Sequence, residues 1–170
     1  MVFQRFISAI GSLAISFLLI SHTAYASSTP SPAAAADKPV QLAVYKSPTC
    51  GCCEEWISHL QSHGLKSTIH HPDDLNAIKN RYRISPQYQS CHTAVSPDGY
   101  VFEGHIPAPV ITRFLAEKPR GAIGLAVPGM PVGSPGMEMG ERFTPYDVLL
   151  LKSDGSSEVY IRITSLTQTF

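Results

Sequence analysis

The chain has 170 residues, 44% of them hydrophobic, with 13 Lys and Arg residues balanced by 13 Asp and Glu residues. This length and composition allow one domain with a substantial hydrophobic core. The formal net charge of zero provides no basic surface, which argues against nucleic-acid binding.

The first 26 residues have the pattern of a cleavable secretory signal. Arg5 is the one early charge, an apolar run covers residues 14–20, and residues 24–26 read Ala-Tyr-Ala, a small-residue cleavage site. Residues 27–39 are rich in Ser, Pro and Ala and are predicted to form a disordered tether. No later stretch approaches the roughly 20 apolar residues of a membrane span. We therefore expect an exported protein whose folded domain covers residues 40–170.

Strand and helix patterns alternate from Val40 onward. Strands are predicted at residues 42–45, 66–70, 92–95 and 100–102, and helices at 53–63, between Pro72 and Pro86, and between Pro107 and Pro119. This order, β-α-β-α-β-β-α, is that of the thioredoxin fold, an α/β class. Residues 119–145 are predicted as a Gly/Pro/Met-rich loop, and residues 147–151 and 159–163 as a C-terminal β-hairpin that extends the sheet.

Three cysteines, Cys50, Cys52 and Cys53, occupy the turn between the first predicted strand and the first helix. A thiol at a helix N-terminus faces unpaired backbone N–H groups and the positive end of the helix dipole, which favour its thiolate. The C-x-x-C spacing of Cys50 and Cys53 suits thiol–disulfide exchange, and Cys52 adds a sulfur that a metal site can use. A structural disulfide is the plainer alternative, although a bridge across four residues constrains the unfolded chain little.

Cys91 opens the third predicted strand. In the thioredoxin arrangement this strand lies antiparallel beside the first, so its beginning lies next to the cysteine turn. All four cysteines are therefore expected in one place. The residues Ser90-Cys91-His92 stand where thioredoxins have a cis-proline, which weakens an interpretation as a plain exchange enzyme.

The histidines differ in their expected relation to this place. His105 ends the fourth predicted strand and is a candidate ligand. Strand alternation directs His92 to the side away from Cys91. His59 and His63, four residues apart on the first helix, are interpreted as a solvated face, and residues 70–71 as surface.

The methionines of the 119–145 loop indicate which metal is bound. Thioether sulfur is a ligand suited to Cu(I), and a flexible loop can bring Met130 and Met137 over the cysteines as a lid. The alternative is that these methionines pack over the core as gap-fillers. The candidate metal ligands are Cys50, Cys52, Cys53, Cys91, His105, Met130 and Met137.

Four motifs between about Val40 and Ile163 carry a family resemblance. They are S-P-T-C-G-C-C at residues 47–53, S-C-H-T at 90–93, E-G-H-I-P at 103–107, and V-P-G-M-P at 127–131 continued by G-S-P-G-M-E at 133–138. In these motifs the chain resembles the CopG-like family of bacterial periplasmic copper-resistance proteins. The resemblance implies a thioredoxin-like fold whose cysteines bind copper, with copper ions and other periplasmic copper-handling proteins as partners.

Two function classes stay open. The first is an exported copper-binding protein that contributes to copper resistance by binding, delivery or redox conversion of copper. The second is a periplasmic thiol–disulfide oxidoreductase in which Cys50 attacks and Cys53 resolves. An enzymatic activity on copper or on thiols is thus compatible with the sequence. A weaker third interpretation is an iron–sulfur carrier, because four cysteines suffice for a cluster.

Overall fold

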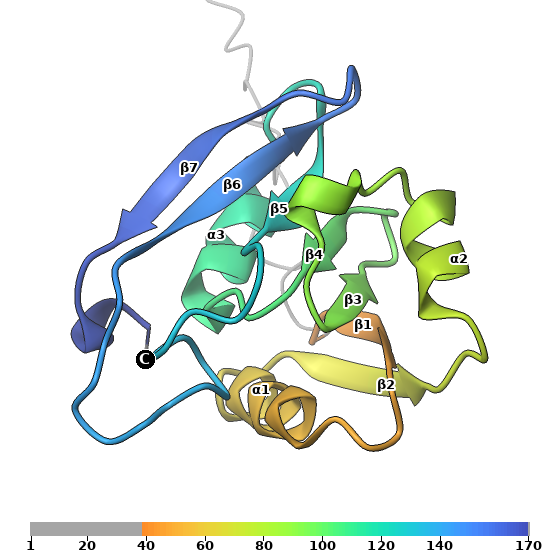
Figure 1. Ribbon diagram of the computed structural model, residues 1–170. Helices are drawn as coiled ribbons and strands as arrows, with labels where there is room; N and C mark the ends of the chain where they lie inside the picture. Colours follow the sequence, from red (N-terminus) through yellow and green to blue (C-terminus); the bar gives the residue numbers. More distant parts are fainter. Residues whose placement is uncertain (1–38, 170) are drawn as a thin grey trace, which may run out of the picture. The chain divides into compact units, whose positions relative to one another are not determined.

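The computed structural model describes residues 39–169, so the predicted signal peptide and all of the predicted tether except Pro39 lie outside the described residues. One sheet of seven strands runs through the domain in the order β2-β1-β3-β4-β5-β6-β7 (Figure 1). The strands are β1 (Gln41–Lys46), β2 (Lys66–His70), β3 (His92–Val95), β4 (Val101–Glu103), β5 (Ala122–Ala126), β6 (Tyr146–Lys152) and β7 (Ser157–Ile163). The helices are α1 (Gly51–Ser62), α2 (Leu75–Arg81) and α3 (Ala108–Glu117), with short 3₁₀ turns at Pro86–Tyr88 and Leu166–Gln168.

The predicted thioredoxin-like α/β fold is confirmed. β1 pairs in parallel with β2 through the α1 crossover and antiparallel with β3, and β4 continues from β3 as a hairpin. The predicted C-terminal hairpin is also present, since β6 and β7 pair antiparallel at the far side of the sheet. Among residues 39–169, no helix has the length and hydrophobicity that a membrane span requires.

Alternating side chains divide the core between the two faces of the sheet. Ala94 and Phe102 contribute to a large cluster with apolar residues of α1 and α3, while their neighbours Val95 and Val101 belong to a smaller cluster. The smaller cluster includes Ile84, which follows α2. Helices α1 and α3 therefore cover one face of the sheet, and α2 with the turn that follows it covers the other.

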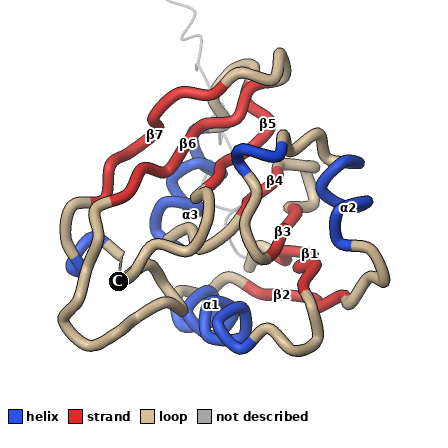
Figure 2. The backbone as a smooth tube through the Cα atoms, in the orientation of Figure 1, coloured by secondary structure: helices blue, strands red, loops and turns tan. Residues whose placement is uncertain are grey.

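The loop predicted at residues 119–145 is partly wrong, because Ala122–Ala126 form strand β5. This strand pairs in parallel with β4 and antiparallel with β6, so it joins the thioredoxin-like part of the sheet to the C-terminal hairpin. The loop proper covers residues 127–145 and runs from β5 toward α1 before it reaches β6 (Figure 2).

The solvated position predicted for His59 is also wrong. Its ring is 8% exposed, and its Nε2 accepts a hydrogen bond of 2.9 Å from the backbone N–H of Ala108. Ala108 is the first residue of α3, and Pro107 before it offers no side-chain cap. His59 on α1 therefore satisfies one of the free N–H groups at the start of α3. Burial, followed by the neighbouring His63, lowers the pKa of His59 to about 4.

We predict that this contact makes the stability of the fold depend on pH. Between pH 6.5 and about pH 4 the unfolded chain takes up a proton at His59 and the folded chain does not, so stability falls as the pH falls through this window. The full effect is on the order of 3 kcal/mol. In denaturant titrations at several pH values, His59→Gln should reduce this slope, with the remainder contributed by the other buried histidines, whereas the exposed His70→Gln should keep the parental slope. If His59→Gln kept the pH dependence of the parent's stability, the proposed contribution of the His59–Ala108 contact would be contradicted.

Candidate metal centre

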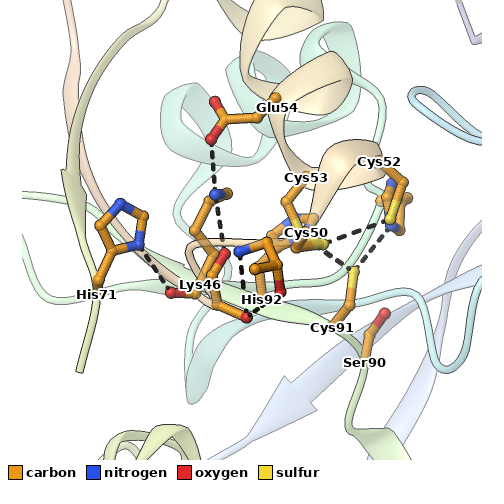
Figure 3. The surroundings of a disulfide bond; sticks show 12 residues. Lys46, Cys50, Cys52, Cys53, Glu54, His71, Ser90, Cys91 and His92 are labelled. Atoms are coloured by element: carbon orange, nitrogen blue, oxygen red, sulfur yellow. Dashed lines mark hydrogen bonds and ion pairs between the residues drawn. A yellow bond between two sulfur atoms is a disulfide. The ribbon is translucent and has the colours of Figure 1, made fainter. Parts of the chain in front are cut away.

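The four cysteine sulfurs converge at the start of α1 (Figure 3). Cys50 and Cys53 form a disulfide, and Cys52 and Cys91 are free thiols. Cys50 Sγ lies 3.4 Å from Cys52 Sγ, and Cys53 Sγ lies 3.5 Å from Cys91 Sγ. All four sulfurs lie within 4.8 Å of one another. Two thiolates bound to one ion at about 2.3 Å can be at most about 4.6 Å apart, so once the disulfide is reduced small adjustments suffice for shared ligation.

The pairing of β1 with β3 brings these residues together, as the sequence predicted. Lys46 at the end of β1 is opposite His92 at the start of β3. The chain turns after Lys46 and enters α1 at Gly51, with Cys50 as the N-cap residue. Cys91, which directly precedes β3, therefore lies beside the cysteine turn although it is about 40 residues away in sequence.

Two buried imidazoles complete the cluster around Cys91. His105 Nδ1 lies 2.7 Å from the carbonyl oxygen of Pro135 and must donate to it, because a carbonyl only accepts. The lone pair of His105 Nε2 is then free to face Cys91 Sγ at 3.0 Å. His105, predicted as a candidate ligand, thus lies in contact with the cysteine cluster. Its role as a ligand stays a prediction.

His92 was expected on the side away from Cys91, and this expectation is wrong. Its Nδ1 lies 3.3 Å from Cys91 Sγ, and Cys91, His92 and His105 form a second group whose ligand atoms lie within 4.8 Å of one another. Alternation fails here because Cys91 lies in a bend before β3 and not in the strand itself. The His92 ring is fully buried against Trp56, and its Nε2 has no hydrogen-bond partner among residues 39–169.

The interior of the site favours uncharged groups when no cation is present. Burial raises the pKa of the Cys91 thiol to about 12, with a further contribution from Cys52. Burial also lowers the pKa of His92 and of His105. A soft cation bound to Cys91 would displace the thiol proton, because the thiolate is the ligand form.

The loop of residues 127–145 closes over the cysteines through its backbone. The Ser90 hydroxyl, next to Cys91, donates to the carbonyl of Gly129, and the carbonyl of Pro135 holds His105. Gly136 lies against the first turn of α1: a Cβ built there would meet the carbonyl oxygen of Cys52 and would lie 2.8 Å from the backbone nitrogen of Trp56.

The candidate ligands Met130 and Met137 directly follow two of these anchored glycines. Met130 follows Gly129 and is 52% exposed, and Met137 follows Gly136 and is partly buried. The backbone of both methionines therefore passes close to the cysteine cluster. Ligation by their thioether sulfurs stays a prediction.

A set of buried and partly buried cysteines and buried imidazoles at the first strand–helix junction of a thioredoxin-like domain defines a thiol site of the redox or soft-metal class. A family of unknown function, DUF411, matches residues 88–137, which include Cys91, His105 and most of the loop. Two solved structures, titled copper resistance protein CopG form 2 and form 1, are each 41% identical to the chain. Each match covers 75% of this chain and 100% of the CopG chain, with TM-scores of 0.71 and 0.70. No curated protein matches.

The chain belongs to the CopG copper-resistance family. Family membership and the cysteine cluster together identify a copper-related protein.

Gly136 provides a test of how closely the loop must approach α1. Its φ of +84° and its contact with Cys52 both disfavour a side chain, whereas Gly140 in the same loop has a φ of +65° and open space around it. Gly136→Ala should cost at least about 2 kcal/mol of unfolding free energy, because backbone strain and overpacking add. Gly140→Ala should cost about 1 kcal/mol, from strain alone. If denaturant titrations gave equal losses of unfolding free energy for the two variants, the loop would not need its close approach to α1 at Gly136.

Proposed function

We propose that the chain is an exported copper-binding protein that holds Cu(I) on its cysteine cluster and contributes to copper resistance by binding, delivery or redox conversion of copper. The observation that carries this proposal is the convergence of four cysteine sulfurs within 4.8 Å. Thiolate and thioether sulfur select Cu(I), and imidazole also suits copper. The titles of the 41% identical structures, which name a copper resistance protein, support the same function. Export rests on the signal-like pattern of residues 1–26.

The donor set fits copper in two further respects. Two groups of possible ligands share Cys91: one holds the four cysteine sulfurs, and the other adds the imidazoles of His92 and His105. The imidazole nitrogen of His92 that faces the cluster is Nδ1, which lies 3.3 Å from Cys91 Sγ. Positive ends of backbone dipoles at the start of α1 would stabilise the anionic thiolates.

A thiol–disulfide oxidoreductase is the second candidate, and the Cys50–Cys53 disulfide favours it. Cys50 is partly exposed and Cys53 is fully buried, so an incoming thiol reaches Cys50 more easily. One contact argues against this function. The backbone N–H of Ser90, beside Cys91, is hydrogen-bonded inside the protein to Glu103 and is not available to a substrate peptide. An iron–sulfur carrier, the weaker third possibility, would be recognised by its optical spectrum.

Cu(I) competition titrations with a chromophoric chelator separate the two main candidates. The fully reduced protein should bind Cu(I) at least about tenfold more tightly than the disulfide form, because reduction restores two thiol ligands. Cys52→Ser or Cys91→Ser should also weaken binding by at least about tenfold, or about 1.4 kcal/mol. Insulin reduction by the same variants is the counter-assay. If both serine variants keep parental copper affinity while exchange needs only Cys50 and Cys53, the oxidoreductase is the correct function.

The proposed role of the methionines has its own test. Replacing Met130 and Met137 together by leucine keeps volume and apolarity, so stability should change by less than about 1.5 kcal/mol while Cu(I) affinity falls. The affinity loss should be largest at acid pH, where thiolates are protonated and neutral thioethers are not. Met139→Leu is the matched control, since Met139 is 48% exposed and its sulfur contacts Arg142. Parental affinity of the double variant at both neutral and acid pH would show that these methionines only pack.

A further inference from the structure

A buried carboxylate lies next to the segment that carries Cys91. Glu103 is the last residue of β4, and its side chain is fully buried. Its Oε1 accepts a hydrogen bond of 2.7 Å from the backbone N–H of Ser90, and its Oε2 accepts one of 2.6 Å from Thr93 Oγ1. The Lys79 ammonium group of α2 forms an ion pair with Oε1. Donors from three separate segments thus offset the cost of burying this charge.

The hydrogen bond to Ser90 is the one that bears on the thiol site, because Ser90 directly precedes Cys91. The rest of Ser90 is held by other groups. Its hydroxyl donates to Gly129, and its Cβ packs against Gly104, where an added Cβ would lie 2.7 Å away. Glu103 therefore anchors the backbone at Ser90 itself, while the loop and Gly104 hold the side chain of Ser90.

Glu103 is also connected to the segment that carries His105. β4 ends at Glu103 and leads through Gly104 into His105, and the Gly104 N–H donates to the carbonyl of His92 at 3.0 Å. One side chain thus joins the backbone of the Cys91 segment to the backbone of the His105 segment. Cys91 Sγ and His105 Nε2, on the two segments joined in this way, lie 3.0 Å apart.

We propose that Glu103 is the positioning residue of the thiol site: by accepting the Ser90 N–H, its carboxylate oxygen sets the place of Cys91 Sγ relative to Cys53 and His105. Lys79 stabilises the buried carboxylate but does not bond to Ser90. A purely structural role would make only global stability depend on Glu103. A positioning role makes the order of the Ser90–Cys91 segment depend on an oxygen at this place. The consequence of this positioning for copper affinity rests on the proposed function, whereas the positioning of Cys91 itself does not.

Two double variants isolate that oxygen. Lys79→Met/Glu103→Met and Lys79→Met/Glu103→Gln both remove the buried ion pair, which apolar groups of similar size can replace at little cost. They differ in that Gln keeps an oxygen to accept the Ser90 N–H and an amide group to donate to Thr93, whereas Met has neither. Thr93→Val is a further control, since it removes the donor to Oε2 and leaves the Ser90 bond in place.

The first readout uses the metal-free protein. Backbone amide exchange of Ser90, followed by NMR, should be at least about tenfold faster in the Met double variant than in the Gln double variant. Amides in the centre of β1 and β3, such as those of Val44 and Ala94, should exchange alike in both. Thr93→Val should keep the slow parental exchange of Ser90. Equal Ser90 exchange rates in the two double variants would overturn the proposal.

The second readout is the thiol itself. In a Cys52→Ser background with the Cys50–Cys53 disulfide intact, Cys91 is the one reactive thiol, and its alkylation should be at least about tenfold faster with Met than with Gln at position 103. If the Met double variant does not fold, an ester in place of the Ser90 amide removes the N–H and keeps every side chain. The ester should accelerate Cys91 alkylation to the same extent, and an unchanged rate would overturn the proposal.

A Cu(I) titration of the reduced double variants, with Cys52 present, connects the inference to function. Affinity should be at least about tenfold weaker with Met than with Gln. A parent protein that binds no Cu(I) would refute the proposed function, and the exchange and alkylation rates would still decide the role of Glu103. A parent that binds Cu(I), together with equal exchange, alkylation and affinity in the two double variants, would refute the positioning role alone.

Discussion

The antiparallel pairing of β1 with β3 is the constraint on which the site depends. β1 runs into the cysteine turn, and β3 begins where β1 ends, with Lys46 opposite His92. Any residue just before β3 must therefore lie beside the first turn of α1, and in this chain that residue is Cys91. The β3–β4 hairpin adds a further residue to the site. Because β4 pairs antiparallel with β3, the end of β4 lies beside the start of β3, and His105 follows shortly after it. Three strand ends thus supply the donors, and the sheet fixes their spacing.

The buried polar network makes this arrangement rigid. Trp56 donates its indole N–H to the carbonyl of Ile106, so α1 is fastened to the chain just after His105. His59, one turn further along α1, accepts from the first N–H of α3. Because each contact joins α1 to residues near or after β4, movement of the cysteines relative to His105 would break hydrogen bonds that are shielded from water. A site held in this way can present several ligands without an ion to assemble them.

Local patterns were sufficient to predict the element order from β1 to α3 and the convergence of the cysteines, because periodicity, turn residues and the crossover rule act over short distances. The errors have long-range causes. The glycines and prolines of residues 119–145 predict a loop, but strand β5 forms within this segment because β4 and β6 pair with it on both sides. The burial of His59 depends on an N–H group 49 residues away. His92 turns toward Cys91 because of a bend that no strand pattern contains. The role inferred for Glu103 likewise could not be predicted from the sequence, since its hydrogen-bond donors, Lys79, Ser90 and Thr93, lie 10 to 24 residues before it in the chain.

The disulfide and a metal ion would compete for the same sulfur atoms, since all four sulfurs lie within 4.8 Å of one another. When Cys50 and Cys53 are bonded to each other, neither can act as a thiolate ligand, and Cys91 remains with Cys52 and the two imidazoles. Reduction takes two electrons and two protons and returns two thiols to the cluster. The two proposed functions would therefore need Cys50 and Cys53 in different states: copper binding needs both thiols reduced, and thiol exchange needs the pair to cycle between disulfide and dithiol. The redox state of Cys50 and Cys53 must set how many sulfur ligands the site can offer, and hence how well it suits a soft monovalent ion.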